Sequence, residues 1–203
     1  MAVKVKICGV RTVADAVAAA AAGADFLGLN FHPASPRCVD AATARAIVRA
    51  VSGVACVGVF VDRPPHEIAA VVRDVGLAVV QLHGDEPPAH CLGLGCQTIK
   101  ALRARPGEDL VARAAAYDTD WLLLDAWVDG VAGGTGVPVD LEAARGLPLE
   151  RLFVAGGLRV ETVADVVRGL RPFAVDVASG VERAPGIKDH GKIDEFIRRA
   201  KAA

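Results

Sequence analysis

The feature that most constrains the fold is an alternation, repeated along the chain, of short hydrophobic runs with alanine-rich helical stretches. Eight of these runs are continuously apolar, which is typical of parallel strands that are covered on both faces. The predicted strands are Val3–Ile7, Phe26–Phe31, Ala55–Val61, Ala78–Leu82, Thr98–Leu102, Trp121–Leu124, Leu152–Ala155 and Phe173–Val177. The predicted helices are Thr12–Ala22, Ala42–Val51, Pro65–Val75, Pro88–Leu94, Asp109–Ala116, Leu141–Arg145, Val160–Gly169 and Lys192–Ala202.

Eight strand–helix units in 203 residues leave about 25 residues for each unit. A strand, its helix and the next parallel strand need about 30 residues, so consecutive units must share a strand. No linker or block of charge marks a domain boundary, and no room remains for a second domain. The pattern therefore predicts an α/β fold, a single (β/α)8 TIM barrel over residues 1–203. A doubly wound open sheet is the alternative, but it usually needs fewer strands, and its G-x-G-x-x-G turn is missing after the first strand.

Composition narrows the class of protein. A net charge of −1 argues against nucleic acid as a partner, and 53% hydrophobic residues exclude disorder. The longest apolar run, Ala16–Ala24, is too short to span a membrane, and Arg11 and Asp15 interrupt any secretory signal. Five cysteines without a C-x-x-C pair match neither a metal site nor a disulfide framework. We therefore expect a cytoplasmic protein with reduced thiols, no metal, no membrane contact and no bound nucleic acid.

In such a barrel the active site lies at the carboxyl ends of the strands. Cys8 ends the first strand, where it is either an inert buried thiol or a base whose pKa is lowered. Asp125 closes four apolar residues at the end of the sixth strand, so it either caps a turn or emerges into a cleft. His83 and Asp176 end strands four and eight, as substrate-binding groups or as residues that order their loops.

Small residues gather in three successive loops: Gly133 and Gly134 after strand six, Gly156 and Gly157 after strand seven, and Ser179 and Gly180 after strand eight. Glycine lets backbone N–H groups approach an anion closely, and barrels often bind phosphate after strands seven and eight. The pattern therefore predicts a phosphorylated small-molecule ligand. Arg37, which follows Pro36 in the loop after strand two, is a candidate clamp for a carboxylate.

The chain resembles the phosphoribosylanthranilate isomerase family. The resemblance is carried by ten blocks in family order, namely Lys6-Ile7-Cys8-Gly9, Gly28-Leu29-Asn30-Phe31, Ser35-Pro36-Arg37, Val57-Gly58-Val59-Phe60-Val61, Gln81-Leu82-His83-Gly84, Leu123-Leu124-Asp125, Gly133-Gly134-Thr135-Gly136, Ala155-Gly156-Gly157-Leu158, Asp176-Val177-Ala178-Ser179-Gly180-Val181-Glu182 and Pro185-Gly186-Ile187-Lys188-Asp189. Single blocks are weak, but ten in order are specific. The chain departs from the family pattern at Arg159, around Val139-Asp140-Leu141, and at Ala178, where a serine is common.

The resemblance implies a cofactor-independent Amadori rearrangement of N-(5-phosphoribosyl)anthranilate to 1-(2-carboxyphenylamino)-1-deoxyribulose 5-phosphate in tryptophan biosynthesis. It implies Cys8 as general base and Asp125 as general acid, with Arg37 on the anthranilate carboxylate and the glycine loops on the phosphate. A cysteine with a lowered pKa and an aspartate that is protonated part of the time would suit this chemistry.

Two alternatives stay open. One is another sugar-phosphate barrel, such as a pentose-phosphate epimerase, which typically uses paired aspartates and a metal. The other is a catalytically silent barrel that only binds a phosphorylated metabolite. The pattern does not decide between a monomer and a homodimer.

Overall fold

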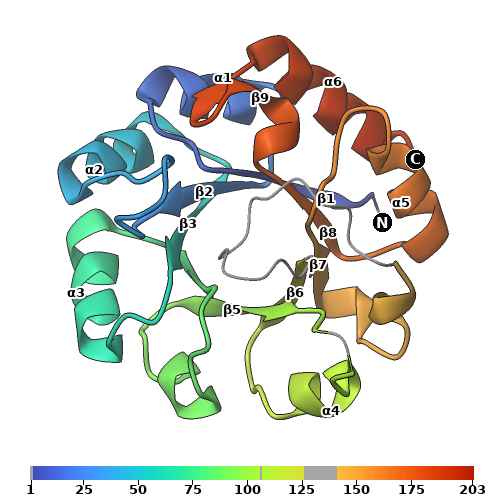
Figure 1. Cartoon of the computed structure of the whole chain (residues 1–203). Coiled ribbons are helices and arrows are strands. Elements are labelled where there is room, and N and C mark those ends of the chain that lie inside the picture. The colour runs from blue at the N-terminus through green and yellow to red at the C-terminus, as the bar shows by residue number, and fades with distance from the viewer. Residues whose placement is uncertain (1, 106, 126–140) are drawn as a thin grey trace.

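The computed structural model describes residues 2–105, 107–125 and 141–203. Eight parallel strands close into a barrel in sequence order, and β1 completes the ring by pairing with both β2 and β8 (Figure 1). The strands are β1 (Lys4–Cys8), β2 (Phe26–Asn30), β3 (Ala55–Phe60), β4 (Val79–Leu82), β5 (Gln97–Arg103), β6 (Trp121–Asp125), β7 (Leu152–Val154) and β8 (Ala174–Val177). The predicted α/β barrel is confirmed.

Six α-helices within the described residues surround this barrel (Figure 1). They are α1 (Val13–Ala21), α2 (Ala41–Ala50), α3 (Pro65–Val75), α4 (Leu110–Ala115), α5 (Val163–Leu170) and α6 (His190–Lys201). Side chains that accept a backbone N–H start four of them: Thr12 for α1, Asp40 for α2, Asp109 for α4 and Asp189 for α6. No helix in the described parts of the chain is long and apolar enough to cross a membrane.

Two predicted helices are wrong. The stretch Pro88–Leu94 forms only a 3-10 turn, η1 (Pro88–Cys91), and Leu141–Arg145 forms another, η2 (Leu141–Ala144). Gly93 and Gly95, which both have positive φ, turn the chain soon after η1 and leave no length for an α-helix. A third 3-10 turn, η3 (Leu149–Arg151), leads into β7.

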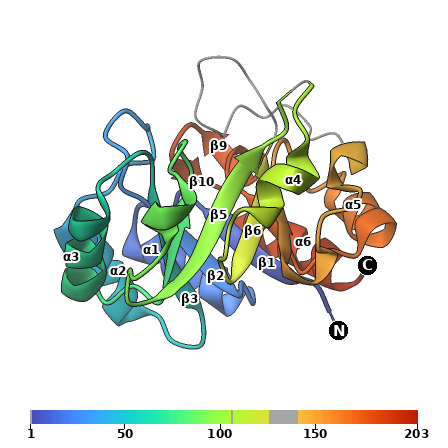
Figure 2. The same cartoon turned by 90° about the horizontal axis from the view of Figure 1, so that it is seen from below.

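A small hairpin after β8 was not predicted. The 3-10 turn η4 (Ser179–Val181) leads into β9 (Glu182–Ala184), which pairs antiparallel with β10 (Ile187–Lys188). Figure 2 shows this hairpin at the end of the barrel towards which β5 points, with the N-terminus at the opposite end. The hairpin therefore belongs to the same end as the loops that follow the barrel strands.

Strand parity decides which side chains face the inside of the barrel. An inner cluster contains Phe26, Val57, Val79, Ile99, Leu123, Phe153 and Ala174, and a larger cluster lies between the sheet and the helices. Alternate residues of a strand share a face, so Gln81, Asp125 and Asp176 face inward with Val79, Leu123 and Ala174. Lys6, which is paired in register with Phe26 and Asp176, faces inward too, and Cys8 follows it. The interior of the barrel is thus apolar near the amino ends of the strands and polar near their carboxyl ends.

Candidate active site

Cys8 ends β1 at the mouth of the barrel, in register with Gly28 of β2. A Cβ atom on Gly28 would lie 2.7 Å from the Cys8 Sγ, so the missing side chain makes the space that the thiol occupies. Burial raises the pKa of the Cys8 thiol above its ordinary 9.0, and the nearby Lys6 and Lys188 ammonium groups counteract this only in part. The expectation of a lowered Cys8 pKa is therefore wrong, because desolvation outweighs the cationic neighbours.

A buried ion pair lies inside the barrel beside Cys8, on the side of the amino end of β1. The Lys6 Nζ donates to Asp176 Oδ2 at 2.9 Å, and both side chains are almost fully buried. Burial lowers the pKa of Lys6, but Asp176 and Cys8 outweigh it and leave that pKa raised, so Lys6 stays charged beneath the thiol. The second carboxylate oxygen, Oδ1, has no hydrogen-bond partner within the described residues. Asp176 thus keeps an acceptor that a ligand hydroxyl could use.

Asp125 ends β6 and is joined to His83, which follows β4. The His83 Nε2 lies 3.1 Å from Asp125 Oδ2, and the His83 Nδ1 lies 2.6 Å from the amide nitrogen of Gln81. The side chains of His83 and Asp125 are 11% and 6% exposed, so water screens their contact little. The structure therefore brings His83 onto the predicted acid residue.

Arg37 is held by the carboxylate of Glu182, which Lys188 also contacts. Its Nε and Nη2 donate to the two carboxylate oxygens of Glu182, each at 2.8 Å, in a bidentate pair. The Lys188 Nζ donates to the same carboxylate and to the Ala178 carbonyl, both at 2.9 Å. Burial raises the pKa of Glu182, but the bonds from Arg37 and Lys188 outweigh it, so the pKa stays below its ordinary 4.5. The bonds from Arg37 use Nε and Nη2, and within the described residues Nη1 makes no hydrogen bond.

The loops after β7 and β8 lie against each other. Gly156 and Gly157 both have positive φ, and a Cβ atom on Gly180 would overlap the Leu158 carbonyl oxygen. Gly157, Ser179, Gly180 and Lys192 help to line a hollow of about 740 Å³. Three of the predicted phosphate residues of these two loops, Gly157, Ser179 and Gly180, therefore line one hollow, whereas Gly156 is not part of its lining. Gly133 and Gly134 lie outside the described residues.

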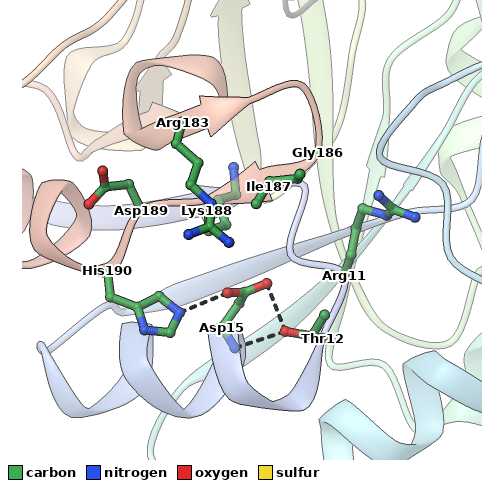
Figure 3. Close-up of a pocket in the computed structure, with 9 residues that line it drawn as sticks. All are labelled: Arg11, Thr12, Asp15, Arg183, Gly186, Ile187, Lys188, Asp189 and His190. Carbon is green, nitrogen blue, oxygen red and sulfur yellow. Dashed lines mark hydrogen bonds and ion pairs between the residues drawn. The ribbon is translucent and has the colours of Figure 1, made fainter.

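A second hollow, of about 610 Å³, lies between the start of α1 and the β9–β10 hairpin. Figure 3 shows His190 pointing to Asp15, with which it makes a 2.8 Å contact, and Arg11 pointing away from that pair. Its lining shares Lys188 with the Arg37–Glu182 contact and Asp189 with the first hollow. Across residues 2–105, 107–125 and 141–203, no three His, Cys, Asp or Glu side chains are placed to share a metal ion.

Comparison with known proteins decides the family. The model of the family described as N-(5'phosphoribosyl)anthranilate (PRA) isomerase matches residues 5–199. This chain belongs to that family. A Myxococcus xanthus N-(5'-phosphoribosyl)anthranilate isomerase is 51% identical over 209 residues, which cover 100% of this chain and 98% of the relative.

Solved structures of the isomerase family share the fold over nearly the whole chain. The Thermotoga maritima enzyme has a TM-score of 0.89 at 37% identity, covering 99% of this chain and 100% of the other. The Thermus thermophilus enzyme has a TM-score of 0.87 at 38% identity, with 97% of each chain covered. A further structure, described as a complex with reduced 1-(o-carboxyphenylamino)-1-deoxyribulose 5-phosphate, has a TM-score of 0.85 at 36% identity over 99% of this chain and 100% of that one.

Sequence reasoning about this isomerase family member missed the residues that support the site. Glu182 and Lys188 stand within two of the recognised blocks, but no role could be predicted for them, because Glu182 pairs with Arg37, which lies 145 positions away in the chain, and Lys188 acts on that same carboxylate. Lys6 and Gln81 lie inside strands, so a search limited to the ends of strands does not include them. The available signal was a charged or amide residue within an otherwise apolar run.

Proposed function

We propose that this chain catalyses the Amadori rearrangement of N-(5'-phosphoribosyl)anthranilate to the corresponding carboxyphenylamino-deoxyribulose 5-phosphate. One observation carries the proposal: a thiol and a carboxylate, Cys8 and Asp125, end β1 and β6 at one barrel mouth and face its interior. The arrangement suits a reaction that needs one base and one acid on the same sugar.

In the proposed reaction, Asp125 donates its proton to the furanose ring oxygen while the bond from that oxygen to C1′ breaks. This leaves a protonated Schiff base between C1′ and the anthranilate nitrogen. Cys8 then removes the proton from C2′ in its thiolate form, which is the minor form at neutral pH because burial raises the pKa of the thiol. The electron pair of the broken C–H bond forms the enolamine. Tautomerisation of the enolamine gives the ketone, so no electrons leave the substrate and no cofactor is required.

The substrate would be held at both ends. Arg37 is proposed to bind the anthranilate carboxylate through the guanidinium edge that Glu182 leaves free. Gly156, Gly157, Ser179 and Gly180, together with Gly133 and Gly134, are proposed to bind the phosphate. Asp176 and His83 are proposed to contact the ribose between these ends, where Asp176 Oδ1 offers an acceptor. Fixing both ends would leave the ribose between acid and base.

Consumption of the fluorescent anthranilate conjugate tests the proposal directly. Wild-type protein should turn it over after metal has been removed with a chelator, whereas a metal-dependent epimerase would not act on it. Cys8→Ala and Asp125→Asn should each lose at least about 100-fold in kcat while keeping the far-UV spectrum of the barrel. Binding of the conjugate without turnover by wild-type protein would instead support the silent binder.

The setting of the activity is also proposed. The five cysteines are free, which supports a reducing compartment, and we assign the chain to the cytoplasm. Residues 1–203 would act as one barrel unit, either as a monomer or as a homodimer, since one Thermotoga maritima relative is described as monomers generated from a dimeric enzyme. Sedimentation analysis of the purified chain distinguishes the two.

A further inference from the structure

Gln81 is a buried polar residue that the proposed chemistry does not use. It lies in β4, its side chain faces the inside of the barrel, and the residue is only 1% exposed. Its amide nitrogen is 2.6 Å from His83 Nδ1, and the other ring nitrogen, Nε2, is 3.1 Å from Asp125 Oδ2. Three side chains thus form one chain of contacts that runs from the barrel interior to the acid residue at the mouth.

The chemistry of the imidazole ring determines which atoms donate and which accept along these contacts. A neutral imidazole carries one N–H, and a carboxylate can only accept a hydrogen bond. When Asp125 is ionised, the hydrogen must therefore be on Nε2, and Nδ1 presents a lone pair. The amide nitrogen of Gln81 donates to that lone pair, while Gln81 Oε1 is buried without a hydrogen-bond partner among the described residues. Turning the amide would set Oε1 against Nδ1 and would require the hydrogen there instead.

We propose that Gln81 is a positioning residue for the isomerase reaction: it holds His83 as the tautomer that donates from Nε2 to Asp125. This inference rests on the proposed function of Asp125. Negative charge develops on that carboxylate as its proton passes to the ring oxygen, and a donor already aimed at Oδ2 stabilises the charge without reorganisation. Such an interaction strengthens on the way to the transition state, so its loss lowers kcat more than it raises KM.

Nitrogen NMR and a mutational cycle test the role. In ¹⁵N spectra of the wild-type protein, His83, assigned by comparison with His83→Ala, should carry its hydrogen on Nε2. Gln81→Glu keeps the shape but places an acceptor at Nδ1, so a hydrogen should appear there. Gln81→Met should lower kcat by at least about 10-fold with KM within about twofold. Gln97→Met, a change at an exposed glutamine at the start of β5, is the matched control and should leave kcat unchanged.

The His83→Ala background separates positioning from simple structural support. If Gln81 acts only through His83, then Gln81→Met should change kcat less than about twofold in that background. An equal loss in both backgrounds, a loss confined to KM, or a wild-type His83 with its hydrogen on Nδ1 would overturn the proposal. Absence of turnover in wild-type protein would refute the proposed function, while the tautomer spectrum would still report on Gln81.

Discussion

Gly28 offers the sharpest test of how the barrel positions its thiol. The residue lies beside Cys8 on the neighbouring strand, and its φ is not in the left-handed region, so Gly28→Ala adds a methyl group without backbone strain. The new Cβ would stand 2.7 Å from Cys8 Sγ and 3.0 Å from Cys8 Cα. Non-bonded heavy atoms prefer separations of about 3.5–4.0 Å, so the thiol must move by about 1 Å.

That displacement sets the expected size of the effect. A misplacement of about 1 Å at a reacting group can cost about 100-fold in rate, so kcat should fall by roughly that factor. Crowding a packed interior by one methyl group should also cost about 1–3 kcal/mol of unfolding free energy. KM should change little, because the residues proposed to hold the carboxylate and the phosphate lie on other loops.

Kinetics and urea unfolding of Gly28→Ala measure both quantities. Gly169→Ala is the matched control, since no heavy atom lies within 4 Å of the added methyl group at that position in α5. It should leave kcat unchanged and stabilise the protein by about 0.5–1 kcal/mol, because alanine is a better helix former than glycine. A folded Gly28→Ala protein with kcat within about twofold of wild type would refute the steric argument.

Three further predictions concern the thiol, the phosphate loops and a buried ion pair. Only the thiolate reacts with iodoacetamide, and the pKa of Cys8 is raised above 9.0, so alkylation of Cys8 should be slow at neutral pH and accelerate with a midpoint above pH 9. Lys6→Met removes an ammonium group that lowers this pKa, so it should move the midpoint higher. Peptide mass spectrometry of the alkylated protein measures both midpoints. Gly180→Ala pushes the loop after β8 off the Leu158 carbonyl and should raise KM at least about 10-fold with a smaller change in kcat; unchanged KM in steady-state kinetics would contradict the phosphate assignment. Lys100→Met leaves Glu86 buried without the ammonium group that lies 2.5 Å from it, so the free energy of unfolding measured in urea should fall by about 3–5 kcal/mol. The double variant Lys100→Met, Glu86→Leu removes both charges and should recover much of that loss.

The barrel itself could be predicted because parallel strands buried on both faces leave a simple signal. All eight apolar runs became strands with boundaries within one or two residues, as β3 shows against the predicted Ala55–Val61. The stretch after β4 could not be predicted well, since η1 is bounded by prolines and glycines that leave room for one turn only. The β9–β10 hairpin is too short to give any periodicity.

The site was predictable only as far as it consists of strand ends. Cys8, His83 and Asp125 could be named because each follows an apolar run at a strand terminus, and Asp176 because it lies one residue before the end of such a run. The bidentate pair between Arg37 and Glu182 could not, because it joins loops that only the closed ring of strands brings together. The direction of the Cys8 pKa shift likewise depends on burial, which a sequence pattern does not measure.

Polar residues inside strands carry information that the strand-end rule leaves unused. Lys6 and Gln81 each stand two positions before Cys8 and His83, so they share the inward face with those residues and contact the site from below. Lys100 has the opposite parity, next to the inward-facing Ile99 and Ala101, and it pairs with Glu86 on the helix side of the sheet. There it donates to the Gly84 carbonyl, while Glu86 accepts from the Gly84 and Asp62 N–H groups. A charged or amide residue within an apolar run therefore supports a reacting group when its parity matches the strand end, and supports a loop when it does not.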